Sequence, residues 1–336
     1  MHVIPESAPD GAARRSDMLA VVLDRFGGVE ELGPRRIPVP EVGEHDVLIR
    51  VEVAGVGSWD AEEREGEYDG AFQLASTFPY VLGWDAAGTV AAVGRNVTEF
   101  QIGERVYAAT MPMVRGGFYA ELGVVEAEHV ARVPDRLPTE QAGAMPWDAL
   151  TALSGLDALD LRAGQTLMVF GASGGIGHLA VQLARERGAR VLAVASGDDG
   201  VALADRLGAD VVVDGRKDDV LAAASMFAPE GLDAALVTAG GETTERSLRA
   251  VRPSGRIAWP NGVFPLPATA PAARVLHYDG DRSRAATARL NTIIETSAFE
   301  VHVARSFPLE QVQDAHRALS EHYVGKLALS VTAHRD

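Results

Sequence analysis

Cysteine is absent from this chain of 336 residues. Its absence excludes disulfide bonds, cysteine-ligated zinc, iron–sulfur clusters and thiol nucleophiles. The chain also has no run of about 18 consecutive apolar residues, so we expect no membrane-spanning segment. Basic residues are in the minority, since 31 Lys and Arg stand against 47 Asp and Glu and leave a formal charge of −16 at pH 7. Because so acidic a chain repels a phosphate backbone, we expect no nucleic-acid partner.

The first 17 residues lack the apolar segment of a secretion signal. They are polar and include Pro5, Pro9 and the pair Arg14–Arg15. We therefore expect residues 1–17 to form a flexible leader. With no secretion signal and no disulfide bonds, the cytoplasm is the expected compartment.

The pattern of apolar residues changes once along the chain, and the length predicts about two domains at roughly 150 residues each. Between His45 and Val56 the side chains alternate with a period of two, which is typical of a half-buried strand. Further short strands are expected at 88–93, 104–109 and 119–125. Beyond residue 139, strands alternate with helices, which predicts a parallel sheet. Its expected strands are 166–170, 191–195, 211–213, 232–237 and 256–259.

The end of the chain has too few strands to form a domain by itself. We expect a helix over 282–296, a strand over 301–306, a helix that begins at Pro308 and a strand over 326–331. His178, His316 and His322 fall on expected helices and form no metal-ligand motif. We expect these three side chains to face solvent.

A glycine-rich turn stands directly between a strand and a helix. The run reads Phe170-Gly171-Ala172-Ser173-Gly174-Gly175-Ile176-Gly177. Its glycines allow a tight turn and a close approach of the backbone to a pyrophosphate, and the helix that follows offers free N–H groups to the anion. The turn therefore predicts dinucleotide binding, with contacts from Gly171, Ser173, Gly174, Gly175 and Ile176.

The end of the next strand bears on which nicotinamide dinucleotide is bound. An acidic residue there would bind the ribose 2′-OH and repel a 2′-phosphate. Ser196 occupies the position, which favours NADPH. Asp198 and Asp199 follow at once and argue against it, and Arg216 is the nearest candidate cation.

Several motifs together resemble the zinc-independent, quinone oxidoreductase-like branch of the medium-chain dehydrogenase/reductase superfamily. They are the run from Phe78 to Val90, the segment Phe100–Val106, the glycine turn, Thr238-Ala239-Gly240-Gly241 and Gly325-Lys326. The resemblance implies an α/β fold in which both chain ends form a GroES-like β domain around an inserted Rossmann domain with a doubly wound parallel sheet. We expect the GroES-like catalytic domain at 18–148 and 281–336, and the Rossmann domain at 149–280. It also implies NADPH-dependent reduction of a quinone or an activated C=C bond, by a homodimer.

Zinc alcohol dehydrogenases share this architecture, but the resemblance does not extend to their metal ligands. Where the zinc enzymes have a Cys in the first cleft loop, this chain has Gly57, and Trp84 and Asp85 replace a His-Glu pair. We therefore expect no zinc site.

The resemblance also suggests roles for individual residues. Tyr68 and Asp60 correspond to cleft-loop positions and are the candidate catalytic residues, Tyr68 as donor to a developing oxyanion and Asp60 either in that role or as a loop tie. Trp59 and Trp84 are candidate walls of the substrate pocket. The further candidate cofactor contacts are Thr151, Thr238, Ala239, Gly240 and Lys326.

Two alternatives remain open from the sequence. The first is a dedicated biosynthetic enoyl or tailoring reductase with one substrate, since Gly57, Trp84 and Gly215 depart from the residues usual in the branch. The second is a dinucleotide-binding sensor protein that does not turn its cofactor over.

Overall fold

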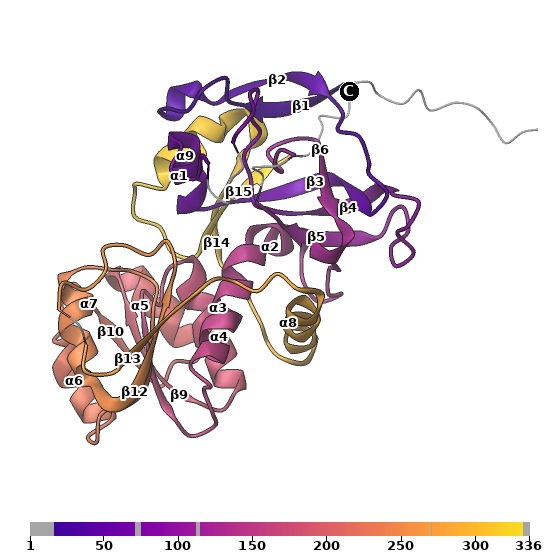
Figure 1. The fold of residues 1–336 in the computed structure, drawn as a ribbon. Helices are drawn as coiled ribbons and strands as arrows, with labels where there is room; N and C mark the ends of the chain where they lie inside the picture. The colour runs from indigo at the N-terminus through magenta and orange to yellow at the C-terminus, as the bar shows by residue number, and fades with distance from the viewer. Residues whose placement is uncertain (1–16, 71–74, 112–114, 270, 332–336) are drawn as a thin grey trace, which may run out of the picture.

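The computed structural model describes residues 17–70, 75–111, 115–269 and 271–331. The expected leader lies outside the described residues except for Asp17, which begins the first strand. The described residues form two domains, each built on its own β-sheet (Figure 1). None of the helices in these residues is both long enough and apolar enough to span a membrane.

The first domain contains a seven-stranded sheet to which both ends of the chain contribute. Strand β15 pairs antiparallel with β3, so that Leu327 lies opposite Val56. The indigo and yellow ends of the chain therefore lie side by side in Figure 1. The sheet order is β14-β15-β3-β4-β5-β7 with β6 on β3, where the strands are β3 (Asp46–Val56), β4 (Asp85–Val93), β5 (Arg105–Ala109), β6 (Leu122–Glu126), β7 (Val130–Arg132), β14 (Val303–Pro308) and β15 (Lys326–Ser330).

Smaller elements complete this domain. Strands β1 (Asp17–Val22) and β2 (Gly33–Pro38) form a separate antiparallel pair. The helices of the domain are α1 (Ser58–Glu65), α2 (Thr139–Ala144), α8 (Arg284–Thr296) and α9 (Val312–Ala318). Sequence patterning did not indicate β1, β2 or α1, because the two strands are short and α1 is rich in charged residues.

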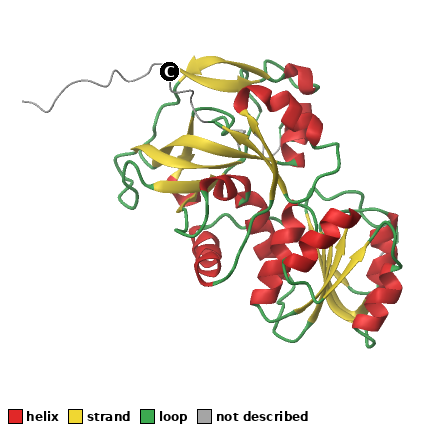
Figure 2. Cartoon of the chain, turned by 180° about the vertical axis from the view of Figure 1, so that it is seen from behind, coloured by secondary structure: helices red, strands yellow, loops and turns green. Residues whose placement is uncertain are grey.

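The second domain is a six-stranded sheet with every neighbouring pair parallel. Its order, β10-β9-β8-β11-β12-β13, reverses direction between β8 and β11, which is the place where doubly wound sheets bind ligands. Helices cover both faces of the sheet (Figure 2). The strands are β8 (Thr166–Phe170), β9 (Arg190–Ala195), β10 (Val211–Asp214), β11 (Leu232–Val237), β12 (Val251–Pro260) and β13 (Arg274–Tyr278), and the helices are α3 (Pro146–Ala158), α4 (Gly175–Glu186), α5 (Gly197–Arg206), α6 (Val220–Phe227) and α7 (Glu242–Ser247).

This architecture confirms the expected fold class, a GroES-like domain made from both chain ends with a Rossmann sheet between them. One strand of the parallel sheet was missed. Strand β13 is only half-buried at the sheet edge, and its apolar residues are too few to stand out from the loop before it. The two domains share one core, in which Tyr107 of the first domain packs with Leu150 and Leu153 of α3 and Leu290 of α8.

Two histidines that we expected on the surface are buried. His178 is 0% exposed, and both of its ring nitrogens have partners. Its Nδ1 is bound to the carbonyl oxygen of Gly174, and its Nε2 accepts the N–H of His302. His316 is 2% exposed and packs edge-on against Tyr119. Burial lowers the pKa of His178 to about 4 and that of His316 to about 3, so both are neutral at pH 7. His322 does face solvent.

Candidate functional site

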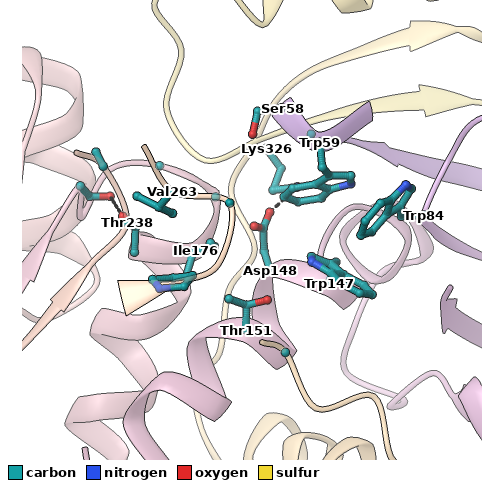
Figure 3. Close-up of a pocket in the computed structure, with 18 of the residues that line it drawn as sticks. Ser58, Trp59, Trp84, Trp147, Asp148, Thr151, Ile176, Thr238, Val263 and Lys326 are labelled. Atoms are coloured by element: carbon teal, nitrogen blue, oxygen red, sulfur yellow. Dashed lines mark hydrogen bonds and ion pairs between the residues drawn. The ribbon is translucent and has the colours of Figure 1, made fainter. Parts of the chain in front are cut away.

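A cavity of about 790 Å³ lies between the two domains, at the point where the strand order of the parallel sheet reverses (Figure 3). The glycine turn after β8, the loops after β9, β11 and β12, and residues 278–280 at the end of β13 form one side of it. Residues of α1, of the loop before β4 and of the start of α3 form the other. The cavity therefore meets the first requirement for a two-substrate reaction, because both partners can lie side by side in one cleft between the domains.

The glycine turn has the geometry of an anion-binding loop. Gly171 has a φ of +85°, and a Cβ on Gly177 would lie 2.0 Å from the carbonyl oxygen of Gly171, so neither position accepts a side chain. Gly174 caps α4 in an extended conformation, and a Cβ there would meet only that same oxygen, at 3.4 Å. The space in front of Gly174 is thus open to the cavity. The first N–H groups of α4 face it without helical partners, as a pyrophosphate requires.

Ser196 at the end of β9 also lines the cavity. Its N–H donates to Ser173 Oγ over 3.2 Å, whereas its own hydroxyl oxygen is buried and hydrogen-bonds to none of the described residues. The acidic residues that follow are both engaged. Lys217 Nζ lies 2.6 Å from Asp198, and His322 Nε2 lies 2.9 Å from Asp199. The tertiary structure thus gives Asp198 a cationic partner and Asp199 an imidazole partner.

Lys326 is in the cavity wall, and sequence reasoning missed its partner. Its Nζ forms an ion pair with Asp148 of α3, and both side chains are 3% exposed. Burial alone would lower the pKa of Lys326, but the carboxylates of Asp148 and Asp85 outweigh it and raise that pKa. The ammonium therefore stays charged, and it lies 4.8 Å from the centroid of the Trp59 ring.

Aromatic side chains form the opposite side of the cavity. Trp84 lies 6.1 Å from Trp59, 5.6 Å from Tyr68 and 4.6 Å from Trp147, measured between ring centroids. Trp84 is anchored because its Nε1–H donates to the buried Glu63 over 2.6 Å. We call Trp59, Trp84, Trp147 and Tyr68 the aromatic wall. The rings are tilted by 42°, 54° and 83° to that of Trp84, so they form an angled apolar surface whose single rings can each pack against a flat molecule.

Tyr68 carries the polar group of the aromatic wall. Its hydroxyl donates to Glu62 Oε2 over 2.6 Å, and both residues line the cavity. Burial and the Glu62 carboxylate raise the pKa of Tyr68 above its usual value. The phenol therefore keeps its proton at neutral pH and acts as a hydrogen-bond donor.

Asp60, the other candidate catalytic residue, does not line the cavity. It is fully buried, and its Oδ2 accepts the N–H of Gly57 over 2.8 Å at the start of α1. Burial raises the pKa of Asp60 to about 8. Its position favours the alternative role, a loop tie that fixes α1 and with it Trp59.

Most of the candidate cofactor contacts line the cavity, namely Thr151, Gly171, Ser173, Gly174, Gly175, Ile176, Ser196, Thr238, Ala239 and Lys326. Two do not. Arg216 is exposed outside the lining, and Gly240 packs its backbone against the carbonyl oxygen of Pro265. Sequence reasoning also missed lining residues of α3, of the end of β13 and of the loops after β12 and β13, namely Trp147, Asp148, Tyr278, Asn261 and Arg282. Asp148 could have been noticed, since it is a carboxylate among the apolar residues at the start of α3.

The residues of the cavity do not fit a catalytic zinc. Such a site needs three protein ligands around one open position. Within the described part of the chain, the group of side chains that could hold a metal ion is Glu126, Glu128 and His129, and none of these lines the cavity. The carboxylates that do line it include Glu62 and Asp148, which are bound to Tyr68 and Lys326.

Comparisons with known proteins agree with this geometry. Residues 43–135 match the alcohol dehydrogenase GroES-like domain, and residues 175–278 match the family described as zinc-binding dehydrogenase. The NADPH-dependent alkenal/one oxidoreductase of Arabidopsis thaliana is 30% identical over 93% of this chain and 79% of its own length. Human quinone oxidoreductase is 28% identical over 89% of this chain and 93% of its own.

Solved structures show the same fold. An NAD-dependent alcohol dehydrogenase superposes with a TM-score of 0.86 at 29% identity, over 94% of this chain and all of that one. A mycobacterial protein complexed with NADPH superposes with a TM-score of 0.80 at 28% identity, with the same coverage. Together with the Arabidopsis relative, these matches show that the chain belongs to the medium-chain dehydrogenase/reductase superfamily, whose members it resembles in both domains.

Proposed function

We propose that this protein is an oxidoreductase that transfers hydride from NADPH to a quinone or to the activated C=C bond of an α,β-unsaturated carbonyl compound, without zinc. The observation that carries the proposal is the cavity itself. One side offers backbone N–H groups for a pyrophosphate, the other offers flat apolar rings, and the described residues that line the cavity include no zinc ligand set.

NADPH is favoured over NADH by three features of the cavity and its surroundings. Ser196 presents a neutral hydroxyl that hydrogen-bonds to none of the described residues. Asp198 forms an ion pair with Lys217, the carboxylate of Asp199 is held by the imidazole of His322, and Arg216 stands exposed near the same loop. The name of the Arabidopsis relative states NADPH dependence, and the mycobacterial structure contains NADPH.

The residues of this chain would act by binding, orientation and proton supply. The bound dinucleotide supplies the hydride, which adds to the acceptor carbon and leaves negative charge on the acceptor oxygen. The O–H of Tyr68, which Glu62 Oε2 accepts in this structure, would turn to that oxygen and donate its hydrogen bond there instead. A proton from solvent completes the reduction, and the aromatic wall excludes other water from the acceptor.

An acceptor of this kind needs no Lewis acid. A quinone or an enone takes hydride at carbon readily, whereas oxidation of an alcohol requires a means of acidifying its hydroxyl. The missing zinc ligands in the cavity therefore favour reduction of activated double bonds over alcohol oxidation. For the same reason, the reactions in the names of the alkenal/one oxidoreductase and the quinone oxidoreductase suit this cavity better than the reaction in the name of the alcohol dehydrogenase.

We further propose that the protein is a homodimer that pairs through the edge strand β13. This strand ends the parallel sheet, and within the described residues only β12 pairs with it. Phe264 and Leu266, which precede it, are 70% and 49% exposed. Light scattering after gel filtration would give the mass of two chains, and the mass of one chain would contradict the pairing.

The experiment that tests the function is a screen of NADPH oxidation across quinones, enals, enones and enoyl thioesters. Turnover with several quinones or enones supports the proposal. Turnover with a single elaborate substrate supports a dedicated reductase instead. Binding of NADPH without oxidation by any acceptor supports a sensor protein and overturns the proposal.

A further inference from the structure

Arg282 is a cation of the cavity wall that the proposed reaction does not use. It stands just before α8, is half-buried, and lies 5.3 Å from the centroid of the Trp147 ring. Among the described residues, none forms a hydrogen bond or an ion pair with its guanidinium. Arg284, two residues further on, is more exposed and yet forms an ion pair with Glu99 over 2.6 Å.

Two rings of the aromatic wall each have a cation beside them. Lys326 lies over Trp59, and Arg282 lies over Trp147, with Trp84 between the two indoles. The charge of Lys326 is cancelled by Asp148. The charge of Arg282 forms no ion pair within the described residues, and the exposed Glu128 and Glu126 attract it only without contact, in a chain whose formal charge is −16.

A half-buried guanidinium without a partner is available to bind an anion. Arginine stays protonated at any ordinary pH, and its planar fork matches a carboxylate with two parallel hydrogen bonds. Burial lowers the pKa of Arg282, although Glu128 and Glu126 act in the opposite direction. Both of these glutamates are exposed and form no ion pair with Arg282, so solvent screens their attraction and the guanidinium donors stay free.

The position of Arg282 separates it from the expected cofactor contacts. Thr238, Ile176 and Val263 lie together on one side of the cavity in Figure 3, and Trp147 lies on the other. Because Arg282 stacks on Trp147, it belongs to the substrate side. An anion bound there would be part of the substrate rather than of the dinucleotide.

We propose that Arg282 binds a carboxylate of the substrate, and that the preferred substrates are flat α,β-unsaturated ketones that carry a carboxylate. This inference rests on the proposed function for the reaction, but the binding site stands on the geometry of Arg282 alone. Because Trp84 and Trp147 stand at 83° to each other, the enone would stack on one of these rings and meet the other edge-on, and the carboxylate would reach Arg282 beside Trp147.

The test compares an acid with its ester. β-Benzoylacrylic acid and its methyl ester share one flat enone, and only the acid carries the charge. We expect the wild type to favour the acid in kcat/KM. In Arg282→Met, kcat/KM for the acid should fall at least about tenfold, since a hydrogen bond to a charged group contributes roughly 1.5–3 kcal/mol, while the ester should change little. Arg284→Met, the matched control, should leave both unchanged.

A binding experiment separates this site from the reaction. Calorimetry with NADP⁺ present would measure the dissociation constants of β-benzoylpropionic acid and its methyl ester, neither of which can be reduced at C=C. Tighter binding of the acid, lost in Arg282→Met, supports the site even if no acceptor is ever reduced. Equal binding of acid and ester by the wild type, or equal loss of both in Arg282→Met, overturns it and leaves Arg282 as a packing partner of Trp147.

Discussion

The two sides of the cavity are built in different ways. The expected cofactor side consists of the turn 171–176 and of loops that each directly follow a strand of one parallel sheet. The substrate side takes Trp59 from α1, Trp84 from the loop before β4, Trp147 from α3 and Arg282 from the segment before α8. Backbone groups dominate the first side, and side chains make the second.

This difference indicates which groups we expect to bind the cofactor and which we expect to bind the substrate. The anion site on the cofactor side requires glycines, because the backbone itself must approach the ligand. The substrate side requires large side chains held in place by buried partners, such as Glu63 beneath Trp84 and Asp148 beside Lys326. A substitution on the cofactor side should therefore weaken cofactor binding by filling space at a single position. A substitution on the substrate side should instead leave the partner of the replaced side chain without its contact.

The largest expected effect concerns a coupled pair. Lys326→Met leaves the carboxylate of Asp148 buried without its partner, which should lower the free energy of unfolding by about 3–5 kcal/mol. The double variant Lys326→Met with Asp148→Leu should recover most of this loss. Urea unfolding of the four proteins in the cycle measures the coupling, and simple additivity of the two single losses would show that the pair does not act as a unit.

Next in size is a steric effect on the glycine turn. In Gly174→Val the protein itself has room for the side chain, so the fold should persist, but the side chain would occupy the pyrophosphate position. We expect the dissociation constant of NADPH to rise about a hundredfold, from the loss of two charge-assisted hydrogen bonds. Gly33→Val in β2, where a Cβ meets nothing within 4 Å, is the control. Unchanged NADPH affinity would move the pyrophosphate away from this turn.

A smaller effect tests whether Ser196 recognises the ribose of the cofactor. Ser196→Asp places a negative charge at the end of β9, which should repel a 2′-phosphate and raise the dissociation constant of NADPH about tenfold while that of NADH falls. Ser196→Asn, which adds bulk without charge, should change the ratio much less. If fluorescence titration shows the same NADPH-to-NADH ratio in all three proteins, the 2′-phosphate is read at another position.

The smallest effect concerns the aromatic wall. Tyr68→Phe removes one hydrogen-bond donor, so kcat should fall about fivefold, which corresponds to roughly 1 kcal/mol, while KM stays near its original value. Tyr80→Phe removes a hydroxyl bound to Glu63 outside the cavity and should affect stability rather than kcat. Steady-state kinetics with one quinone and one enone would check both, and an unaltered kcat in Tyr68→Phe would assign that ring to packing alone.

The cofactor side of the cavity was easier to predict from the sequence than the substrate side. The turn was predictable because strand, glycines and helix are contiguous, and the strand ends at Ser196 and Thr238 followed from the strand pattern. Asp60 was open between catalysis and a loop tie, and only its burial against Gly57 separates the two. The surface placement of His178 was wrong because the segment around His302, distant in sequence, covers it.

From the sequence alone came the change from short strands to alternating strands and helices, the anion-binding turn and the expectation of no zinc site, because each depends on residues that are contiguous or on residue types that are missing. The tertiary structure decided which charges are cancelled. Asp198, Asp199 and Lys326 acquire partners from distant segments, whereas Arg282 acquires only the face of Trp147. The physical reason is that an ion pair depends on distance in space, and folding brings together charges that lie more than a hundred residues apart, as with Lys326 and Asp148.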